Sequence, residues 1–429
     1  MKFLYSDTQD YVDPDYDFDT DRNAPKRRRY WDDKYAHQIM NPIPYDGLLV
    51  AMSAVRKAPG VASSKVRYST AEEQRLLRDG VRKFLRLDGP EYKDAMVMGD
   101  CGAFAYVDQE KPAYSPMEVF EFYADAGFTH GVSPDHIIFA CDTENPPLSA
   151  MDDDVRYRYE LTLENAREFM RICKAEGMPF EPMGAVQGWS PRSIAEAAKR
   201  LEDMGYRYLA IGGLVPLKVD VIHKVLKALR DTIKPETDIH LLGFAKADSI
   251  QEFTGYGITS FDSTSPLIRA FMDEKANYYI PKSDGKLEYY AAIRIPQAVE
   301  NPRLMRGIKQ GIFNAEDLQK REAIALTALR RFNVKEETLE ATIEAVMDYQ
   351  QFLTLGGDED KHQKSLKKTR EQVERTLRAA PWQKCGCDIC KRIGVDVIIF
   401  RSANRNRRRG FHNLGVYHQH VQRILEKTL

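Results

Sequence analysis

The sequence predicts a (β/α)8 barrel, an α/β fold, on three observations. Short apolar runs rich in β-forming residues alternate with longer amphipathic stretches, and this alternation is typical of a parallel sheet. The alternation repeats often enough to favour a closed barrel over an open doubly wound sheet. A glycine fingerprint of the form GxGxxG, which would favour the open sheet, is absent from the chain.

Seven apolar runs are candidate strands, and the place of an eighth strand is unclear. The runs are LLVAMS (48–53), AMVMG (95–99), HIIFA (136–140), MGAV (183–186), YLAIG (208–212), IHLLG (239–243) and ITSFD (258–262). Helical patterns lie between them at 115–127, 163–177, 190–205 and 219–232.

A largely helical segment is expected after the barrel, at 291–380. Asn314 stands three residues before Asp317 as the cap of one helix, and 335–353 repeats apolar residues at helical spacing. The charged stretch 355–368 contains two glycines and is interpreted as a loop or hinge.

A cluster of cysteines near the end of the chain predicts a structural zinc site. The cluster consists of Cys385, Cys387 and Cys390. This spacing lets one tight turn aim three thiolates at one point, and a distant histidine completes a closed tetrahedral site. His412 is the best fourth ligand, while His418 and His420 remain alternatives. Because four protein ligands leave no position for water, the metal would stabilise the local fold.

A basic run follows the cysteines, after a short strand predicted at 395–400. It consists of Arg401, Arg405, Arg407, Arg408 and Arg409. Guanidinium groups on a loop that a metal holds rigid suit contacts with nucleic acid phosphates, although a solvated surface loop is the alternative. A second basic run, KRRRYW (26–31), is either another such contact or a flexible tail.

These patterns divide the chain into four parts. They are an N-terminal arm (1–45), a barrel core (46–290), the helical segment (291–380) and a zinc-binding subdomain with a closing helix (381–429). The whole chain has 63 basic and 64 acidic residues, so any affinity for nucleic acid must come from local patches. No signal peptide or membrane-spanning run is evident, and we expect a cytoplasmic protein without a membrane partner.

Polar residues and glycines follow several predicted strands, where barrel enzymes carry their active sites. They are Asp100, Asp142, Gln187, the pair Gly212 and Gly213, and Asp262. A single aspartate after a strand is most often a cap or turn residue. Five such positions on one rim can instead form hydrogen bonds along the edge of a flat heterocycle such as guanine. The glycines let backbone groups approach the heterocycle where a Cβ would block them.

The order and spacing of several motifs resemble the guanine transglycosylases, which exchange a guanine in nucleic acid for a 7-deazaguanine. The motifs are GDCGAF (99–104), FACD (139–142), VQG (186–188), AIGGL (210–214), LLGF (241–244), SFDSTSP (260–266) and the late CxCxxC with its histidine. The resemblance covers most of the chain from about residue 46 onward.

The resemblance implies a role for each matching residue. Asp262 would be the nucleophile that attacks C1′ and holds the sugar covalently, and Asp100 would be the general acid/base. The residues that would read the purine edge are Asp142, Gln187, Gly213 and Leu214, the last two through their backbone. Phe104 and Leu242 would stack on the two faces of the base.

Departures from the family pattern bear on the substrate. Bacterial tRNA enzymes carry a glutamate where this chain has Lys218, and a Thr-Arg run where it has Leu267 and Ile268. GDCGAFAYV and the following HGVSPDHIIF look closer to the DpdA-type branch, which places 7-cyano-7-deazaguanine into DNA. A cation at Lys218 should disfavour an aminomethyl base and tolerate the neutral cyano base.

Three alternatives to a DNA enzyme remain. One is a tRNA-guanine transglycosylase; another is a nucleic-acid-binding zinc protein without catalysis, which would gain nothing from carboxylates near phosphates. The third is a barrel hydrolase that uses Asp262 and Asp100, for which a zinc-held arginine loop has no purpose. The residues leave open whether a helper protein opens the DNA and whether the protein works as a homodimer.

Overall fold

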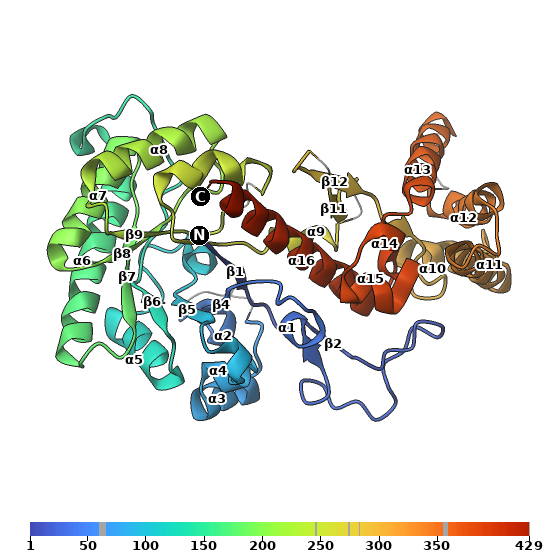
Figure 1. The fold of residues 1–429 in the computed structure, drawn as a ribbon, viewed down its shortest axis with the longest axis horizontal. Coiled ribbons are helices and arrows are strands. Elements are labelled where there is room, and N and C mark those ends of the chain that lie inside the picture. Colours follow the sequence, from blue (N-terminus) through green and yellow to red (C-terminus); the bar gives the residue numbers. More distant parts are fainter. Residues whose placement is uncertain (60–65, 245–246, 273–274, 283, 355–358, 429) are drawn as a thin grey trace. The chain divides into compact units, whose positions relative to one another are not determined.

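The computed structural model describes residues 1–59, 66–244, 247–272, 275–282, 284–354 and 359–428 (Figure 1). The chain forms two compact units. Unit 1 comprises Met1–Gln9, Tyr45–Thr264 and Arg423–Leu429, and unit 2 comprises Asp10–Pro44 and Ser265–Gln422. Each unit is therefore assembled from segments that lie far apart in the sequence.

The described part of unit 1 forms a closed barrel of eight parallel strands in the order β1-β10-β9-β8-β7-β6-β5-β4. The strands are β1 (Lys2–Ser6), β4 (Gly47–Ala51), β5 (Met96–Asp100), β6 (His130–Val132), β7 (Glu181–Val186), β8 (Tyr208–Ile211), β9 (Asp238–Leu241) and β10 (Ser260–Asp262). The predicted (β/α)8 barrel is confirmed.

The barrel begins at Lys2, so the predicted N-terminal arm of residues 1–45 is wrong at its start. KFLYS is the eighth strand, and it pairs in parallel with both β10 and β4. Phe3 and Leu4 are fully buried. The strand is hard to recognise because it has only five residues and an acidic stretch follows it directly.

The predicted strand at 136–140 is also wrong, because the structure places β6 earlier, at His130–Val132. Ile137 and Ile138 are buried, which explains the apolar run. The backbone there is not paired as a strand: the amide of His136 donates to Thr162 Oγ1 at 3.1 Å and that of Ile138 to Gln187 Oε1 at 3.2 Å. Buried coil and buried strand have the same apolar signature in the sequence.

Helices follow the strands of unit 1. They are α2 (Met52–Val55), α3 (Thr70–Asp79), α4 (Val81–Phe84), α5 (Pro116–Ala126), α6 (Asp153–Ala175), α7 (Pro191–Met204) and α8 (Val219–Thr232), with short 3-10 helices at Pro90–Tyr92, Ala103–Tyr106, Leu148–Ala150 and Ala247–Tyr256. The four predicted helices are present. α6 starts ten residues earlier than expected, since Asp152 caps it by accepting from the Val155 amide.

Apolar side chains from the strands fill the barrel. Those of one cluster are Leu4, Leu49, Met96, Met98, Val132, Met183, Ala185, Tyr208 and Ala210, with Leu242 packed against it. Every strand except β9 and β10 contributes to this cluster, so the barrel is a packed core rather than a pore.

Unit 2 is mainly helical. Its helices are α1 (Ala36–Ile39), α9 (Ser265–Arg269), α10 (Pro302–Lys309), α11 (Ala315–Asn333), α12 (Leu339–Thr354), α13 (Glu359–Ala379), α14 (Pro381–Lys384), α15 (Asp388–Ile393), a 3-10 helix at Gly394–Ile398 and α16 (Ala403–Thr428), whose last turn is assigned to unit 1. Three strand pairs accompany them: β2 (Tyr11–Val12) with β3 (Lys34–Tyr35), β11 (Tyr278–Pro281) with β12 (Leu287–Tyr290), and β13 (Ile293–Arg294) with β14 (Ile399–Phe400).

Two predictions about this region need correction. The long segment of unit 1 ends at Thr264, so residues 265–290 belong to unit 2 and not to the barrel core. The predicted loop at 355–368 is helical from Glu359 onward, as part of α13, while 355–358 lies outside the described residues. The Asn314 cap is confirmed, because its Oδ1 accepts from the Asp317 amide at 3.0 Å.

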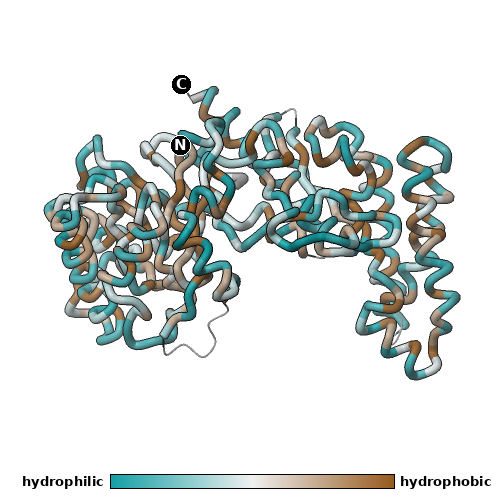
Figure 2. Tube along the Cα trace, turned by 90° about the horizontal axis from the view of Figure 1, so that it is seen from below, coloured by the Kyte–Doolittle hydropathy of each residue, from teal (hydrophilic) through white to brown (hydrophobic). Residues whose placement is uncertain are grey.

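Hydrophobic and hydrophilic residues alternate along the helices of both units (Figure 2). This pattern is typical of helices with one buried and one solvated face. Within the described ranges, no helix combines the length and apolar character needed to cross a membrane.

Candidate active site and metal centre

Asp262 is the last residue of β10, and three groups hold its carboxylate. Oδ1 accepts from the Gly243 amide at 2.7 Å and lies 3.2 Å from His240 Nε2, and Oδ2 accepts from Ser6 Oγ at 2.6 Å. The side chain is 8% exposed. These contacts hold the carboxylate in one orientation at the end of β10.

A chain of buried side chains extends behind His240. Its Nδ1 lies 2.6 Å from Ser260 Oγ, which lies 2.6 Å from the hydroxyl of Tyr208. One arrangement satisfies every group: Tyr208 donates to Ser260, Ser260 donates to Nδ1, and Nε2–H of a neutral His240 donates to Asp262. The chain fixes the imidazole and, through it, the orientation of the carboxylate.

Asp100, the last residue of β5, is a second carboxylate at a strand end. Its Oδ2 accepts from the Gly102 amide at 3.0 Å. Burial is the main cause that raises the pKa of Asp100 to about 7, and the negative charges of Asp135 and Asp262 add to the rise. Asp100 can therefore give up or accept a proton near neutral pH, as a general acid/base must.

Asp135, three residues after β6, was not predicted from the sequence. It is 2% exposed, its Oδ2 accepts from Gln187 Nε2 at 2.6 Å, and its Oδ1 accepts from the Cys101 thiol at 3.2 Å. Burial raises its pKa too. With the 136–140 run taken as the strand, Asp135 appeared to precede the strand instead of following it, which concealed it among the strand-end residues.

Gln187 is held at both ends of its amide. Oε1 accepts from the Ile138 amide and Nε2 donates to Asp135. A Cβ on Gly212 would lie 2.2 Å from Nε2, so glycine is needed there for Gln187 to take this position. Gly213 adopts φ +73°, which residues with a side chain rarely adopt. A Cβ added at Gly213 would also lie 2.8 Å from the Ile138 carbonyl oxygen.

Two aromatic side chains are exposed on the loops after β5 and β6. Phe104 is 60% exposed and Phe139 is 43% exposed, and their ring centroids lie 5.9 Å apart. Exposed aromatic pairs are suited to stacking on a nucleic acid base. Phe104 was predicted as a stacking residue, whereas Phe139 was not.

The remaining predicted residues have different surroundings. Asp142 is exposed, and its Oδ1 accepts from the Glu144 amide at 2.8 Å. This is the turn interaction that was the alternative to a role in base recognition. Leu214 is 1% exposed, so only its backbone is available to a ligand, while Leu242 is partly buried against the barrel core. Lys218 is exposed at the position that precedes α8.

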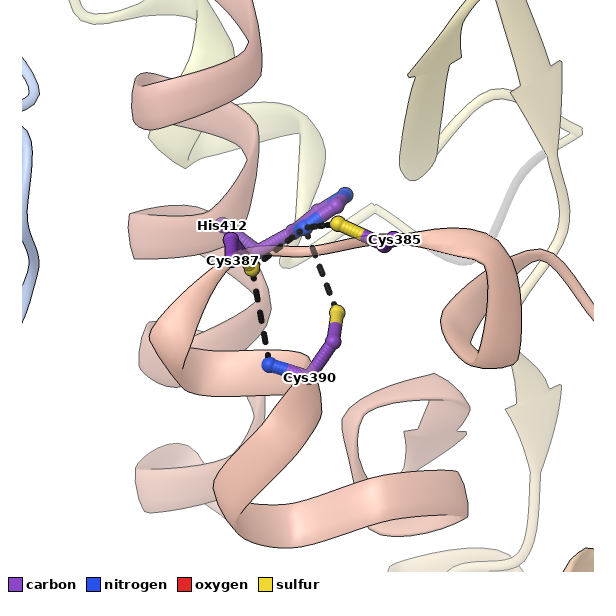
Figure 3. Close-up of side chains that lie close together, drawn as sticks. All are labelled: Cys385, Cys387, Cys390 and His412. Atoms are coloured by element: carbon purple, nitrogen blue, oxygen red, sulfur yellow. Dashed lines mark hydrogen bonds between the residues drawn. The ribbon is translucent and has the colours of Figure 1, made fainter.

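In unit 2, the three clustered cysteines and His412 converge (Figure 3). Their four ligand atoms all lie within 4.8 Å of one another. His412 Nδ1 is 3.5 Å from Cys385 Sγ and 3.4 Å from both Cys387 Sγ and Cys390 Sγ. Cys387 also begins α15, where it accepts from the Cys390 amide.

This geometry fits zinc. With Zn–S near 2.3 Å and Zn–N near 2.0 Å, a tetrahedral site requires N to S separations of about 3.5 Å. Nε2 of His412 lies 2.7 Å from the Tyr279 carbonyl, which can only accept, so the proton sits on Nε2 and Nδ1 is free to bind a metal. The ring of Tyr278 stacks on the imidazole at 4.0 Å and fixes its plane.

The predicted arginine loop is wrong. Arg401 precedes α16, and the other four arginines lie on that helix. Arg405, Arg408 and Arg409 are at most 1% exposed. Arg401 and Arg405 form ion pairs with Asp21, and Arg405 also pairs with Asp396 at 2.8 Å.

The other arginines are also engaged inside unit 2. Arg408 donates to the Asp13 carbonyl at 2.7 Å, Arg409 to carbonyls that include that of Val397 at 3.1 Å, and Arg407 lies 3.5 Å from Asp10. Burial lowers the pKa of Arg405 and of Arg408 to about 10, which leaves both charged at neutral pH. Four of the five arginines are therefore engaged inside unit 2, while the side chain of Arg407 is 33% exposed. Their role in phosphate binding stays a prediction.

The basic run at 26–31 is not a flexible tail. The guanidinium of Arg27 pairs with Asp33 at 2.6 Å, that of Arg28 with Asp32 at 2.9 Å, and Arg29 Nε donates to the Tyr11 hydroxyl at 3.0 Å. These contacts close a folded turn.

Comparison with known proteins gives relatives of stated activity, although no family model matches the chain. A DNA-guanine transglycosylase of Salmonella montevideo is 39% identical over 426 residues, 99% of this chain and 97% of that protein. A tRNA-guanine(15) transglycosylase of Methanopyrus kandleri is 28% identical over 239 residues, 54% of this chain and 46% of the relative. A queuine tRNA-ribosyltransferase of Chlamydia pneumoniae is 32% identical over 79 residues, which cover 18% of this chain and 21% of that protein.

The metal site predicts one zinc ion per chain, bound through His412. His412→Ala should lose the zinc and lower the melting temperature, because removing one ligand opens a site whose binding energy supports the fold. His418→Ala is the matched control, since its Nδ1 lies against the Ile43 carbonyl and not among the cysteines. Zinc content is measured by plasma mass spectrometry. Stoichiometric zinc in His412→Ala would show that the fourth ligand is another group.

Proposed function

Because the chain belongs to the guanine transglycosylase family, we propose that it exchanges a guanine in DNA for 7-cyano-7-deazaguanine through a covalent Asp262–glycosyl intermediate. The observation that carries this proposal is a pair of carboxylates at the ends of β5 and β10 with opposite environments. Asp262 is held by three donors, and the pKa of Asp100 is raised to about 7. Zinc, when bound, supports the fold of unit 2 and takes no part in the reaction.

Asp262 acts as the nucleophile. Its carboxylate attacks C1′ of the target nucleotide as the bond to guanine breaks, and the sugar is held as an ester until the incoming base attacks the same carbon. Two inversions at one carbon give net retention, as in retaining glycosidases. The hydrogen bonds from Gly243 and Ser6 hold the carboxylate in one orientation, which favours in-line attack.

Asp100 carries the proton between the two bases. Guanine leaves more readily when a proton reaches it, and the incoming base must lose one, so a group that titrates near pH 7 serves both steps. Asp135 assists, because its charge disfavours ionisation of Asp100 and its hydrogen bond holds Gln187 toward the base.

The base would lie between exposed aromatic and apolar side chains after it is flipped out of the duplex. Phe104 and Leu242 cover its faces, with Phe139 beside Phe104. Gln187, Asp142 and the backbone of Gly213 and Leu214 read the purine edge. Asp142 would leave its turn with Glu144 to do so.

DNA is favoured over tRNA because the DNA-guanine transglycosylase aligns with 99% of the chain, whereas the two tRNA-directed relatives align with 54% and 18%. The sequence around Lys218 agrees, since it lacks the glutamate that the resemblance to bacterial tRNA enzymes would require.

Base exchange and its covalent intermediate form the first test. Incubation of the protein with duplex DNA and 7-cyano-7-deazaguanine should give a deazaguanine deoxynucleoside by mass spectrometry of the digested DNA. Without added base, a protein–DNA adduct should appear on a denaturing gel. Asp262→Asn should abolish both products, whereas Asp125→Asn, at an exposed position of α5, should change neither. An adduct that survives in Asp262→Asn would exclude this residue as the nucleophile, and a modified ribonucleoside from a parallel tRNA reaction would favour RNA.

The pH dependence of the reaction should follow Asp100. If its protonated form assists guanine departure, kcat/KM falls as pH rises through about 7. Asp135→Asn removes one negative neighbour and keeps an oxygen that can accept from Gln187, so the falling limb should move to lower pH and activity at pH 8 should drop relative to pH 6. A pH profile measured beside that of Asp125→Asn checks this. An unchanged limb in Asp135→Asn would mean that Asp100 is not the titrating group.

Lys218 should set the preference between substituents of the incoming base. Lys218→Glu is expected to raise kcat/KM for an aminomethyl-deazaguanine relative to the cyano base by about tenfold, through attraction of the ammonium group. A glutamate before α8 suits the helix N-terminus, so the fold should tolerate it. Lys224→Glu makes the same charge change at an exposed position of α8 and is the control. Equal preferences in both variants would place Lys218 outside the pocket.

A further inference from the structure

Arg405, Arg407, Arg408 and Arg409 of α16 are buried or paired, so other basic groups of unit 2 are better placed to bind a phosphate. The described residues of unit 2 contain a cavity with basic lining between β13, α12 and α13. Its polar lining residues are Lys275, Arg294, Gln350, Thr354, Ser365, Lys368, Thr369 and Gln372. No carboxylate is among the described residues that line it.

Two cations of this cavity have no partner among the described residues. Lys275 and Lys368 are exposed, and neither has an ion pair or hydrogen bond with any described residue. Neighbouring cations of α13 differ: Arg370 pairs with Glu344, and Arg375 lies 3.5 Å from Glu288. Two positive charges that line one cavity repel each other electrostatically, and an anion bound between them offsets this repulsion.

The walls of the cavity are fixed. β13 pairs with β14, and Gln350 Nε2 donates to the Arg294 carbonyl. Thr376 Oγ1 donates to the Ala291 carbonyl at 2.9 Å, which ties α13 to the segment before β13. On α13 the lining residues Ser365, Lys368, Thr369 and Gln372 follow helical spacing, so they share one face. The cations are therefore presented on a preformed frame.

The polar groups of the lining match one ligand chemistry. Ammonium and guanidinium groups beside hydroxyls and amides supply charge and several donors, which is what phosphate oxygens accept. A carboxylate near these groups would oppose an anion, and the described lining has none.

We propose that this cavity binds a backbone phosphate of the DNA, with Lys275 and Lys368 as its cationic contacts. This inference rests on the proposed function, since it takes DNA as the substrate. It gives unit 2 a direct role in holding the nucleic acid, separate from the carboxylates of the barrel.

The test is the salt dependence of DNA binding. Fluorescence anisotropy with a short labelled duplex compares the full-length protein with the double variant Lys275→Ala/Lys368→Ala. Loss of one neutralised phosphate should weaken binding about fivefold to tenfold and reduce the slope of log K against log salt by about 0.9. The matched control is Lys309→Ala/Lys320→Ala, which removes two exposed lysines of unit 2 that do not line the cavity and should bind as wild type.

Two results would overturn the proposal. One is equal affinity and slope in the cavity variant and the control. The other comes from calorimetry with inorganic pyrophosphate. If the wild type binds pyrophosphate and the cavity variant does not, while both bind DNA equally, then the cavity binds a free phosphate compound and not DNA. Binding is read without base exchange, so failure of the wild type to modify DNA would count against the proposed function alone.

Discussion

Closure of the barrel by β1 is the constraint on which the candidate active site depends. β10 carries Asp262, and its neighbour on one side is the first strand of the chain, with Leu4 opposite Asp262. Two residues further on, Ser6 donates to the carboxylate, while β9 and the turn after it supply His240 and Gly243 from the other side. A slip of one residue in β1 would turn Ser6 to the other face of the sheet. β1 is therefore a strand of the barrel and not part of an arm, and its last residue, Ser6, belongs to the candidate site.

A second pairing of distant segments organises unit 2. The acidic stretch after β1 compensates the arginines in and just before α16. Asp21 accepts ion pairs from Arg401 and Arg405, and the Asp13 carbonyl accepts from Arg408. Burying guanidinium groups is costly unless each is paired, so neither segment can fold in this way alone. The same helix carries His412, and the charge pairing thereby also holds this candidate metal ligand in place.

Much of this could be predicted from the sequence, and the errors have physical causes. Apolar runs located β4, β5, β7, β8, β9 and β10, and cysteine spacing located the cluster that could hold a metal. β6 was misplaced because buried coil is as apolar as a strand, and that error concealed Asp135. The arginines were expected to face solvent because one acidic partner, Asp21, lies 380 residues before Arg401, a separation that local periodicity does not reveal. His240 and Ser6 carry no motif and become relevant only through the barrel register.

The two strand-end carboxylates differ in what surrounds them, and this difference supports the roles proposed for them. Asp262 meets the Ser6 hydroxyl, the Gly243 amide and His240, all of which favour a negative oxygen. Asp100 has the Gly102 amide but faces the charges of Asp135 and Asp262, and burial with these charges favours its protonated form up to about pH 7. A nucleophile must be ionised when the leaving group must receive a proton, so one site needs both states at once. In the proposed reaction, Asp100 donates its proton to the departing base while the oriented carboxylate of Asp262 attacks C1′, so the two different environments serve two different steps.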